Sequence, residues 1–209
     1  GSLAIGYTGN NGNHNSDQYT GYGAKLGAYY DVTSDMTVAA AYMSEIEMKY
    51  GNQLSNAAAG FGLMTGSPMG AGFSDTLTQP SQMKAGVSYN VSSSIAVTAD
   101  YKLINWSGAA GYKDFNWKDQ NVVAVGVKYS GTGFWLGLGY NSADDPIGNL
   151  TATRGPNGAP PPNYRNAAIN FFNNMLFPAI VKESYTLGGG YSFTKALDVE
   201  AAFVYTPEV

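Results

Sequence analysis

The chain has 209 residues, a charged fraction of 12%, a net charge of -4 and no cysteine. This charged fraction is about half of the roughly 25% found in an ordinary soluble domain. The sequence also has no block rich in lysine and arginine, so it gives no sign of a nucleic-acid-binding surface. No apolar run of about 18 residues is present, which excludes transmembrane helices, and without cysteine there is neither a disulfide nor a thiolate metal site.

Apolar and polar residues alternate from the first residues to the last. In 82–91, for example, Met83, Val87 and Tyr89 share one face of an extended chain, and Lys84 and Ser88 share the other. A period of two predicts β-strands rather than helices. In chain order, the expected strands are 2–8, 22–32, 36–50, 82–91, 94–103, 121–129, 134–141, 185–193 and 196–205.

Charge is segregated between the two faces of these strands. The central parts of the apolar faces carry no charge, whereas the opposite faces carry residues such as Lys84, Asp100 and Lys128. A lysine that faces lipid at mid-depth costs roughly 2–4 kcal/mol, so the pattern is typical of a membrane β-barrel with a polar lumen. Tyrosines such as Tyr30 and Tyr205 recur towards the strand ends, as interfacial aromatic girdles require.

Short and long connections alternate strictly along the chain. The short ones are 31–35, 91–94, 131–133 and 193–196, and the long ones are 9–20, 51–80, 107–118 and 142–180. In an antiparallel meander all short turns then lie at one end, so we expect an all-β, up-and-down transmembrane β-barrel with short periplasmic turns and long extracellular loops. We expect a single domain over 1–209 that is a piece of a longer barrel, with its nine strands drawn into a closed or nearly closed sheet.

The order of these segments resembles the outer-membrane long-chain fatty acid transporter family, the FadL/TodX type. The resemblance is carried by Pro80 with "KAGVSY" after it, by "ADYKLINWS", and by "NWKDQNVVAVGVKY" with Trp117. It implies a fourteen-stranded barrel with an N-terminal hatch and a lateral opening for hydrophobic compounds. The nine strands would then be the fifth to the thirteenth, without the hatch.

Enzymatic and metal-binding constellations are weak. The single histidine, His14, lies in an Asn/Gly-rich segment without neighbouring carboxylates, and Asp144 and Asp145 precede a proline, where acidic residues usually form turns. Calcium binding by this pair is the minor alternative. Glu45 and Glu47 share one face, where pairing with lysines is a simpler role than glycosidase chemistry. We therefore expect no enzyme activity, no cofactor and no metal.

Two long connections are apolar for segments exposed to water, and they carry the candidate ligand-binding residues. In 163–181, Ala167, Phe171, Phe172 and Met175 have helical spacing, which predicts a short amphipathic helix before Pro178. The loops either pack on one another as a lid or form a shallow site for lipid-like molecules, and the two roles are compatible. The residues expected to capture a ligand are Phe61, Leu63, Met64, Phe73, Phe171, Phe172 and Met175.

The sequence thus predicts a monomeric transporter in the bacterial outer membrane that binds hydrophobic compounds, such as long-chain fatty acids, and passes them by diffusion. Its surroundings would be outer-membrane lipid or detergent. Alternatives are a general porin for small polar solutes, an outer-membrane enzyme or adhesin that uses the loops, and a soluble β-sandwich with the faces reversed. The orientation has a simple check, because Lys84 should find a polar or acidic partner on the inner face.

Overall fold

The computed structural model describes residues 2–3, 17–18, 20–51, 73–152, 164–177 and 180–207, and its main element is an eight-stranded antiparallel sheet. Each strand pairs with its sequential neighbours in the order β3-β4-β7-β8-β9-β10-β11-β12. The strands are β3 (Lys25–Asp31), β4 (Met36–Met43), β7 (Gln82–Asn90), β8 (Ile95–Ile104), β9 (Gln120–Gly131), β10 (Phe134–Ala143), β11 (Glu183–Thr194) and β12 (Leu197–Tyr205). The up-and-down antiparallel meander expected from the alternation is therefore confirmed.

The sheet differs from the expectation in closure and in strand number. Within the described residues, β3 and β12 are its two edges, so the sheet is open. The described part of the expected first strand over 2–8 is not in it, since β1 (Ser2–Leu3) pairs with β2 (Asp17–Gln18) in a separate two-stranded sheet, and 4–8 lie outside the described residues. The expected strand over 36–50 ends early, and its second part, β5 (Ile46–Lys49), pairs with β6 (Thr76–Gln79), which the sequence pattern did not predict.

The break between β4 and β5 has a local cause at Ser44. Its hydroxyl oxygen accepts a hydrogen bond from the backbone N–H of Ala24 at 2.9 Å, and its own N–H donates to the Ala24 carbonyl at 2.9 Å. A side-chain acceptor thus replaces a backbone acceptor in the ladder, which is how serine interrupts regular structure. The chain beyond Ser44 is then free to pair with β6 instead of continuing in the main sheet.

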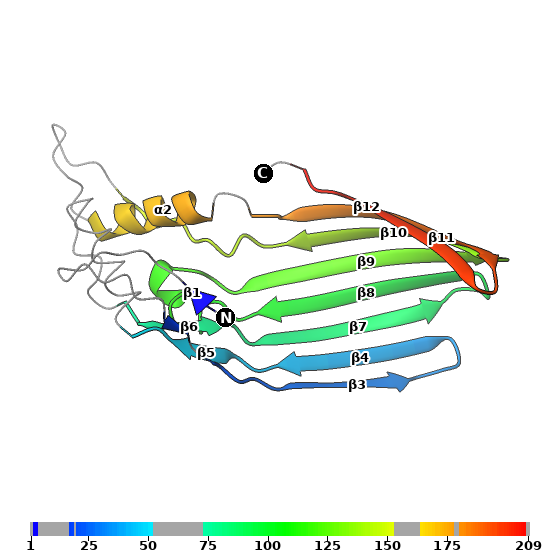
Figure 1. Ribbon diagram of the computed structural model, residues 1–209, viewed down its shortest axis with the longest axis horizontal. Helices are drawn as coiled ribbons and strands as arrows, with labels where there is room; N and C mark the ends of the chain where they lie inside the picture. Colours follow the sequence, from blue (N-terminus) through cyan, green and yellow to red (C-terminus); the bar gives the residue numbers. More distant parts are fainter. Residues whose placement is uncertain are drawn as a thin grey trace.

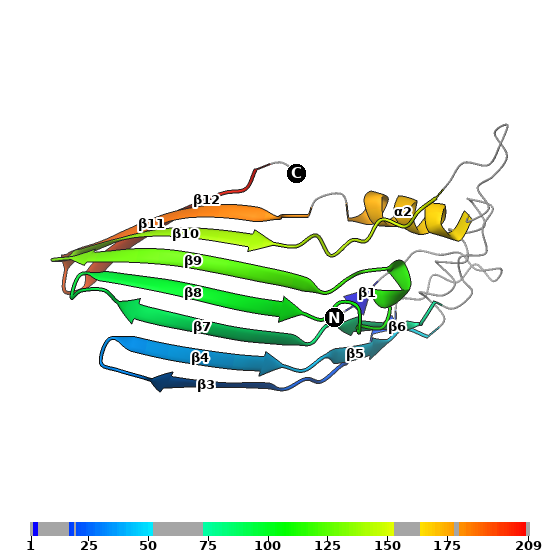
Figure 2. The same ribbon diagram turned by 180° about the vertical axis from the view of Figure 1, so that it is seen from behind.

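Turns and loops are sorted to opposite ends of the sheet (Figures 1 and 2). The four tight turns join β3 to β4, β7 to β8, β9 to β10 and β11 to β12, as expected. The opposite end carries β5, β6, the short helix η1 (Lys113–Phe115) and the helix α2 (Tyr164–Leu176). No helix among the described residues is long and apolar enough to cross a membrane.

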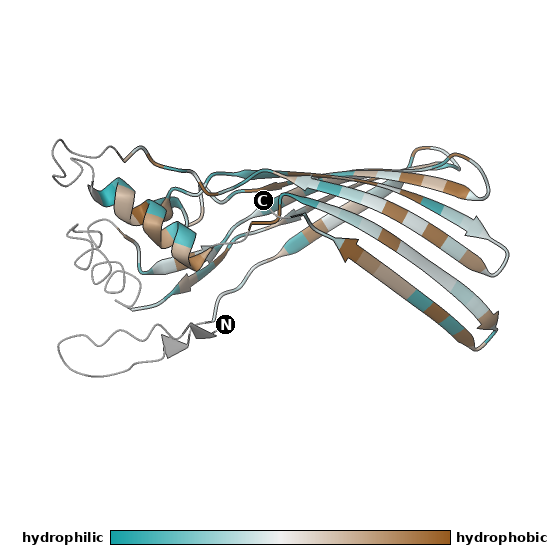
Figure 3. Ribbon diagram, turned by 90° about the horizontal axis from the view of Figure 1, so that it is seen from above, coloured by the Kyte–Doolittle hydropathy of each residue, from teal (hydrophilic) through white to brown (hydrophobic). Residues whose placement is uncertain are grey.

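The strand register places the expected apolar residues on one continuous face, and their alternation with polar residues is visible in Figure 3. One row across five strands is Val97, Val127, Leu138, Leu187 and Phe203. These apolar side chains stand out from the molecule, since Leu138 is 59% exposed and Phe203 is 64% exposed. On β9 and β10 the opposite, polar face is the less exposed one. The two-faced pattern predicted from the sequence is therefore confirmed.

The polar face carries the charged strand residues and brings them into contact. Lys84 Nζ lies 3.4 Å from Asp100 Oδ1 on the neighbouring strand, so the expected partner of Lys84 is found. Gly86, which is opposite Asp100 in the register, leaves the space that the carboxylate occupies, because a Cβ there would collide with Asp100 Oδ1. Glu47 pairs with Lys49 at 3.1 Å, as the lysine-pairing interpretation predicted.

Candidate ligand-capture site at the long-loop end

The long connections pack into a compact structure at one end of the sheet, which we call the loop cap and define as residues 73–75, 105–119, 144–152 and 164–177. One cluster of its buried apolar residues consists of Phe73, Phe115, Trp117, Ala168 and Ile169. They come from three segments that are far apart in the sequence, and together they exclude water from one contiguous cluster. The packing of these loops on one another, as predicted, is therefore present in the described residues.

Aromatic rings provide most of this packing. Trp117 lies at the centre, with ring centroids 4.9 Å from Trp106, 5.0 Å from Tyr112 and 4.9 Å from Phe177. Phe115 stacks on Phe172 of α2 at 4.4 Å with an interplanar angle of 8°. Such pairs contribute roughly 0.5–1.5 kcal/mol each beyond the area that they bury, so the cluster holds α2 firmly on the loop 105–119.

One buried polar side chain fixes the position of α2. Asn173 is fully buried, its side-chain oxygen accepts a hydrogen bond from Trp117 Nε1 at 3.2 Å, and its amide donates to the Phe115 carbonyl at 2.9 Å. A buried amide without hydrogen-bond partners would destabilise the folded state, so these two bonds favour one position of the helix on the loop. Asn170 adds a second tie, because its amide group exchanges hydrogen bonds with the backbone of Leu150 at 2.9 and 2.6 Å.

Burial also affects ionisation within the loop cap. Desolvation raises the pKa of Tyr112, and the nearby Tyr50 raises this pKa further. The phenol is therefore neutral at ordinary pH, which suits its place against the Trp117 ring. Asp114 accepts a hydrogen bond from the Ser74 N–H at 2.8 Å and so ties the segment that follows residue 72 to the same loop.

The predicted capture residues fall into three groups. Phe73 and Phe172 belong to the packed cluster, where both contact Phe115, with Phe73 at a centroid distance of 4.8 Å. Phe171 and Met175 lie one helical turn apart on the outer side of α2, where they are 54% and 50% exposed. Phe61, Leu63 and Met64 lie outside the described residues. The structure thus joins two of the seven in the core of the loop cap and places two on its surface.

The predicted helix is confirmed, but the face that it buries was foreseen only at Phe172. The sequence pattern drew attention to Ala167, Phe171, Phe172 and Met175, whereas α2 packs on the loop cap through Ala168, Ile169, Phe172 and Asn173. Phe115, Trp117 and Asn173 were also missed as members of the site. The aromatic spacing in 112–117 was a usable signal for the first two, but nothing local indicates that an asparagine about fifty residues later lies beside them.

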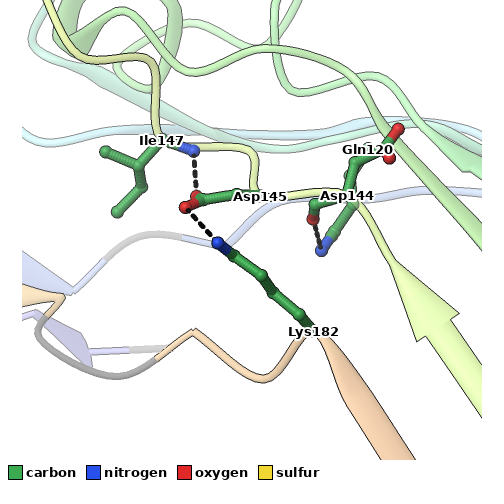
Figure 4. Close-up of polar contacts among 5 residues, drawn as sticks. All are labelled: Gln120, Asp144, Asp145, Ile147 and Lys182. Atoms are coloured by element: carbon green, nitrogen blue, oxygen red, sulfur yellow. Dashed lines mark hydrogen bonds and ion pairs between the residues drawn. The ribbon is translucent and has the colours of Figure 1, made fainter. Parts of the chain in front are cut away.

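Asp144 and Asp145 stabilise the point where β10 leaves the sheet (Figure 4). Gln120 Nε2 donates to the Asp144 carbonyl oxygen at 2.9 Å. Asp145 accepts from the Ile147 N–H at 2.9 Å and lies 3.5 Å from Lys182 Nζ. An aspartate that accepts from the N–H two residues later is a turn former, so the expected turn role is observed for Asp145. The Asp144 carboxylate instead accepts a hydrogen bond from the Asn121 side-chain amide at 2.6 Å.

Open hollows lie along the apolar face of the sheet. One of them has a volume of about 700 Å³ and is lined by side chains such as Leu138, Tyr140, Leu187, Phe203 and Tyr205. Tyr140 and Tyr185 contact one another at 5.1 Å at its loop-cap side. The face therefore combines apolar hollows with a tyrosine row, an arrangement suited to lipid chains and their polar ends.

Comparisons with solved structures bear on this architecture. The chain is similar to the Pseudomonas putida toluene transporter TodX, with a TM-score of 0.51 and 16% identity, over 88% of this chain and 43% of that one. It is also similar to the TodX deltaS2S3 mutant monoaromatic hydrocarbon channel, with a TM-score of 0.50, 17% identity, and coverage of 89% of this chain and 44% of that one. The chain has the fold of part of TodX.

The likeness confirms, at the level of the fold, the resemblance to the FadL/TodX type that the sequence indicated. The chain spans less than half of the length of these transporters, so a sheet with two open edges is what such a part would show. No protein-family model matches the chain, and no curated protein matches it in sequence.

Proposed function

We propose that the chain forms part of the wall and the loop cap of a monomeric bacterial outer-membrane β-barrel that carries hydrophobic compounds by binding and passive diffusion. Residues 1–209 act in this proposal as a single domain. No covalent chemistry is involved, since the driving force is the transfer of apolar surface from water into the loop cap and onward along the barrel.

The observation that carries the proposal is the continuous apolar face of the sheet. Its row through Val127, Leu138 and Leu187 leaves side chains that are 40% to 59% exposed. In water such a face would be unfavourable at roughly 25 cal/mol for every Å² of apolar surface, and soluble proteins rarely present so large a patch. Outer-membrane lipid is the natural cover for it, with the charged face directed to the lumen.

The loop cap supports the capture of hydrophobic compounds from the outside. In the proposal, Phe171 and Met175 are the first contact, Phe73 and Phe172 form the floor beneath, and Phe61, Leu63 and Met64 complete the site. Each methylene moved from water onto such a surface gains about 0.8 kcal/mol, so long-chain fatty acids are suitable ligands. The similar structures are named as transporters or channels for toluene and monoaromatic hydrocarbons, and we include such compounds in the proposed ligand class.

Uptake measurements on the full polypeptide that carries this sequence test the proposal. The double substitution of Phe171→Ser and Met175→Ser should lower the uptake of a long-chain fatty acid at unchanged surface display, since both side chains are on the exposed side of α2. Asn174→Ser, at an exposed position of the same helix, is the matched control. Unchanged uptake in the double variant contradicts the capture role, and a large ionic conductance of the purified protein would support a general porin instead.

A further inference from the structure

Two lysines stand directly opposite one another on the polar face of the sheet. The register pairs Lys84 of β7 with Lys102 of β8, two strands that lie side by side in Figure 1. Like charges at directly opposite positions destabilise a strand pair. A position where local chemistry works against the overall structure is where a function is expected, so this pair requires an explanation.

Only one of the two lysines has a counter-ion in the described part of the chain. Lys84 Nζ lies 3.4 Å from Asp100 Oδ1, whereas Lys102 takes part in no ion pair or hydrogen bond with a described residue. On its other side Lys102 is opposite Val122 of β9, and Ile104 follows it on the same face of β8. The neighbouring positions of the wall therefore offer this ammonium group no further acceptor.

Few acidic residues of the chain remain as partners for Lys102. Apart from Asp17 and Glu208, every aspartate and glutamate has a described side chain, and none of these pairs with Lys102. The connections 52–72 and 153–163, which lie outside the described residues, contain neither aspartate nor glutamate. The missing negative charge is therefore sought beyond residues 1–209.

The wall beside the lysines carries small side chains. Ala41 of β4 is opposite Lys84, and Gly27 of β3 continues this row. In the next row towards the tight turns, Ala39 is opposite Gly86. Residues without large side chains allow another backbone to come close to the sheet. The lysine pair thus borders a part of the polar face where a polypeptide segment fits against the wall.

We propose that Lys84 and Lys102 form a docking site for a carboxylate side chain on a segment of the same polypeptide outside residues 1–209. The segment lies on the small residues of β3 and β4, and its carboxylate bridges the two ammonium groups through charge-assisted hydrogen bonds. With Asp100, two negative charges then balance the two lysines. The inference rests on the proposed function in one respect, namely that the polar face is the inner face of a closed barrel.

Carbodiimide crosslinking of the full polypeptide, purified in detergent and analysed by mass spectrometry, identifies the partner. This reagent joins an ammonium and a carboxylate group that are in ion-pair contact. Lys84 should link to Asp100, and Lys102 should link to an aspartate or glutamate outside residues 1–209. Lys195, in the tight turn between β11 and β12, should not link to that segment. Links of Lys102 to residues within 1–209 alone, or to an added long-chain fatty acid, would overturn the proposal.

Charge reversal separates docking from a role within the wall alone. Lys102→Glu places a carboxylate opposite Lys84, so an effect confined to the wall would leave the exchange of the linked segment unchanged. Docking instead predicts that backbone hydrogens of this segment exchange roughly tenfold faster or more, because its carboxylate is repelled. Lys128→Glu, elsewhere on the polar face, is the matched control and should leave this exchange unchanged.

The outcomes of these experiments are independent of the uptake measurement. Unchanged or slower exchange of the segment in Lys102→Glu would refute the docking site and leave the proposed transport intact. An intact crosslink in a protein that takes up no hydrophobic compound would instead retain the docking site and refute the transport function.

Discussion

The packing of α2 on the rest of the loop cap can be tested by changing one side-chain amide, that of Asn173. Asn173 is fully buried and makes two hydrogen bonds, one from Trp117 Nε1 at 3.2 Å and one to the Phe115 carbonyl at 2.9 Å. Asn173→Ala removes both and leaves a buried donor and a buried acceptor without partners. At about 1–2 kcal/mol for each orphaned group, the expected loss is about 2–4 kcal/mol of the local stability of the loop cap.

Hydrogen exchange followed by mass spectrometry measures this loss separately from the stability of the sheet. Because each 1.4 kcal/mol is a factor of ten, backbone amides of α2 should exchange roughly 30-fold faster or more, while those of β8 to β11 should be unchanged. Asn174→Ala, at the adjacent exposed position, should have no effect. Unchanged exchange of α2 in Asn173→Ala would refute the view that this amide holds the helix, and uniformly faster exchange would show that the cap and the sheet unfold as one unit.

Three further predictions follow from the two faces and the loop cap. Leu187→Lys, on the apolar face, should lower the free energy of unfolding in lipid by roughly 2–4 kcal/mol, whereas Thr186→Lys, at the neighbouring position on the polar face, should be tolerated. Denaturation of both variants in bilayers measures the difference, and equal losses of stability would contradict the assigned faces. Gly86→Ala should lower the denaturation midpoint, because the new methyl group displaces Asp100 from Lys84. The loss of stability should be at most about 1 kcal/mol, since the ion pair is exposed, and it should vanish in an Asp100→Ala background. The pKa of Tyr112 is raised above its usual value of 10.0 by burial and by a neighbouring tyrosine. The contribution of Tyr112 to stability is therefore present below pH 10.0 and is lost as pH rises through the raised pKa. Thermal unfolding measured against pH should show this loss, and Tyr112→Phe should remove the pH dependence.

The strands and their two faces could be predicted because they depend on near neighbours in the chain. Alternation places Met83, Val87 and Tyr89 on one side whatever the rest of the protein does, and tight turns such as 91–94 force the next strand to run back. The limits of this reasoning are also local. Ser44 interrupts an otherwise continuous pattern with one side-chain hydrogen bond, and β6 pairs with β5 across a long connection that has no periodic signal.

The sequence by itself determined which side chains share the apolar face, where the tight turns lie, and that a helix precedes Pro178, since each of these follows from spacing within a few residues. Only the tertiary structure decided which face of α2 is buried, that Asn173 meets Trp117, and that Trp135 lies on the glycines of β11. Those contacts join segments some fifty residues apart, and their energies depend on distances that no local pattern records. The physical reason is that the spacing of residues along the chain sets the direction in which a side chain points, whereas the packing of distant segments sets which groups it contacts.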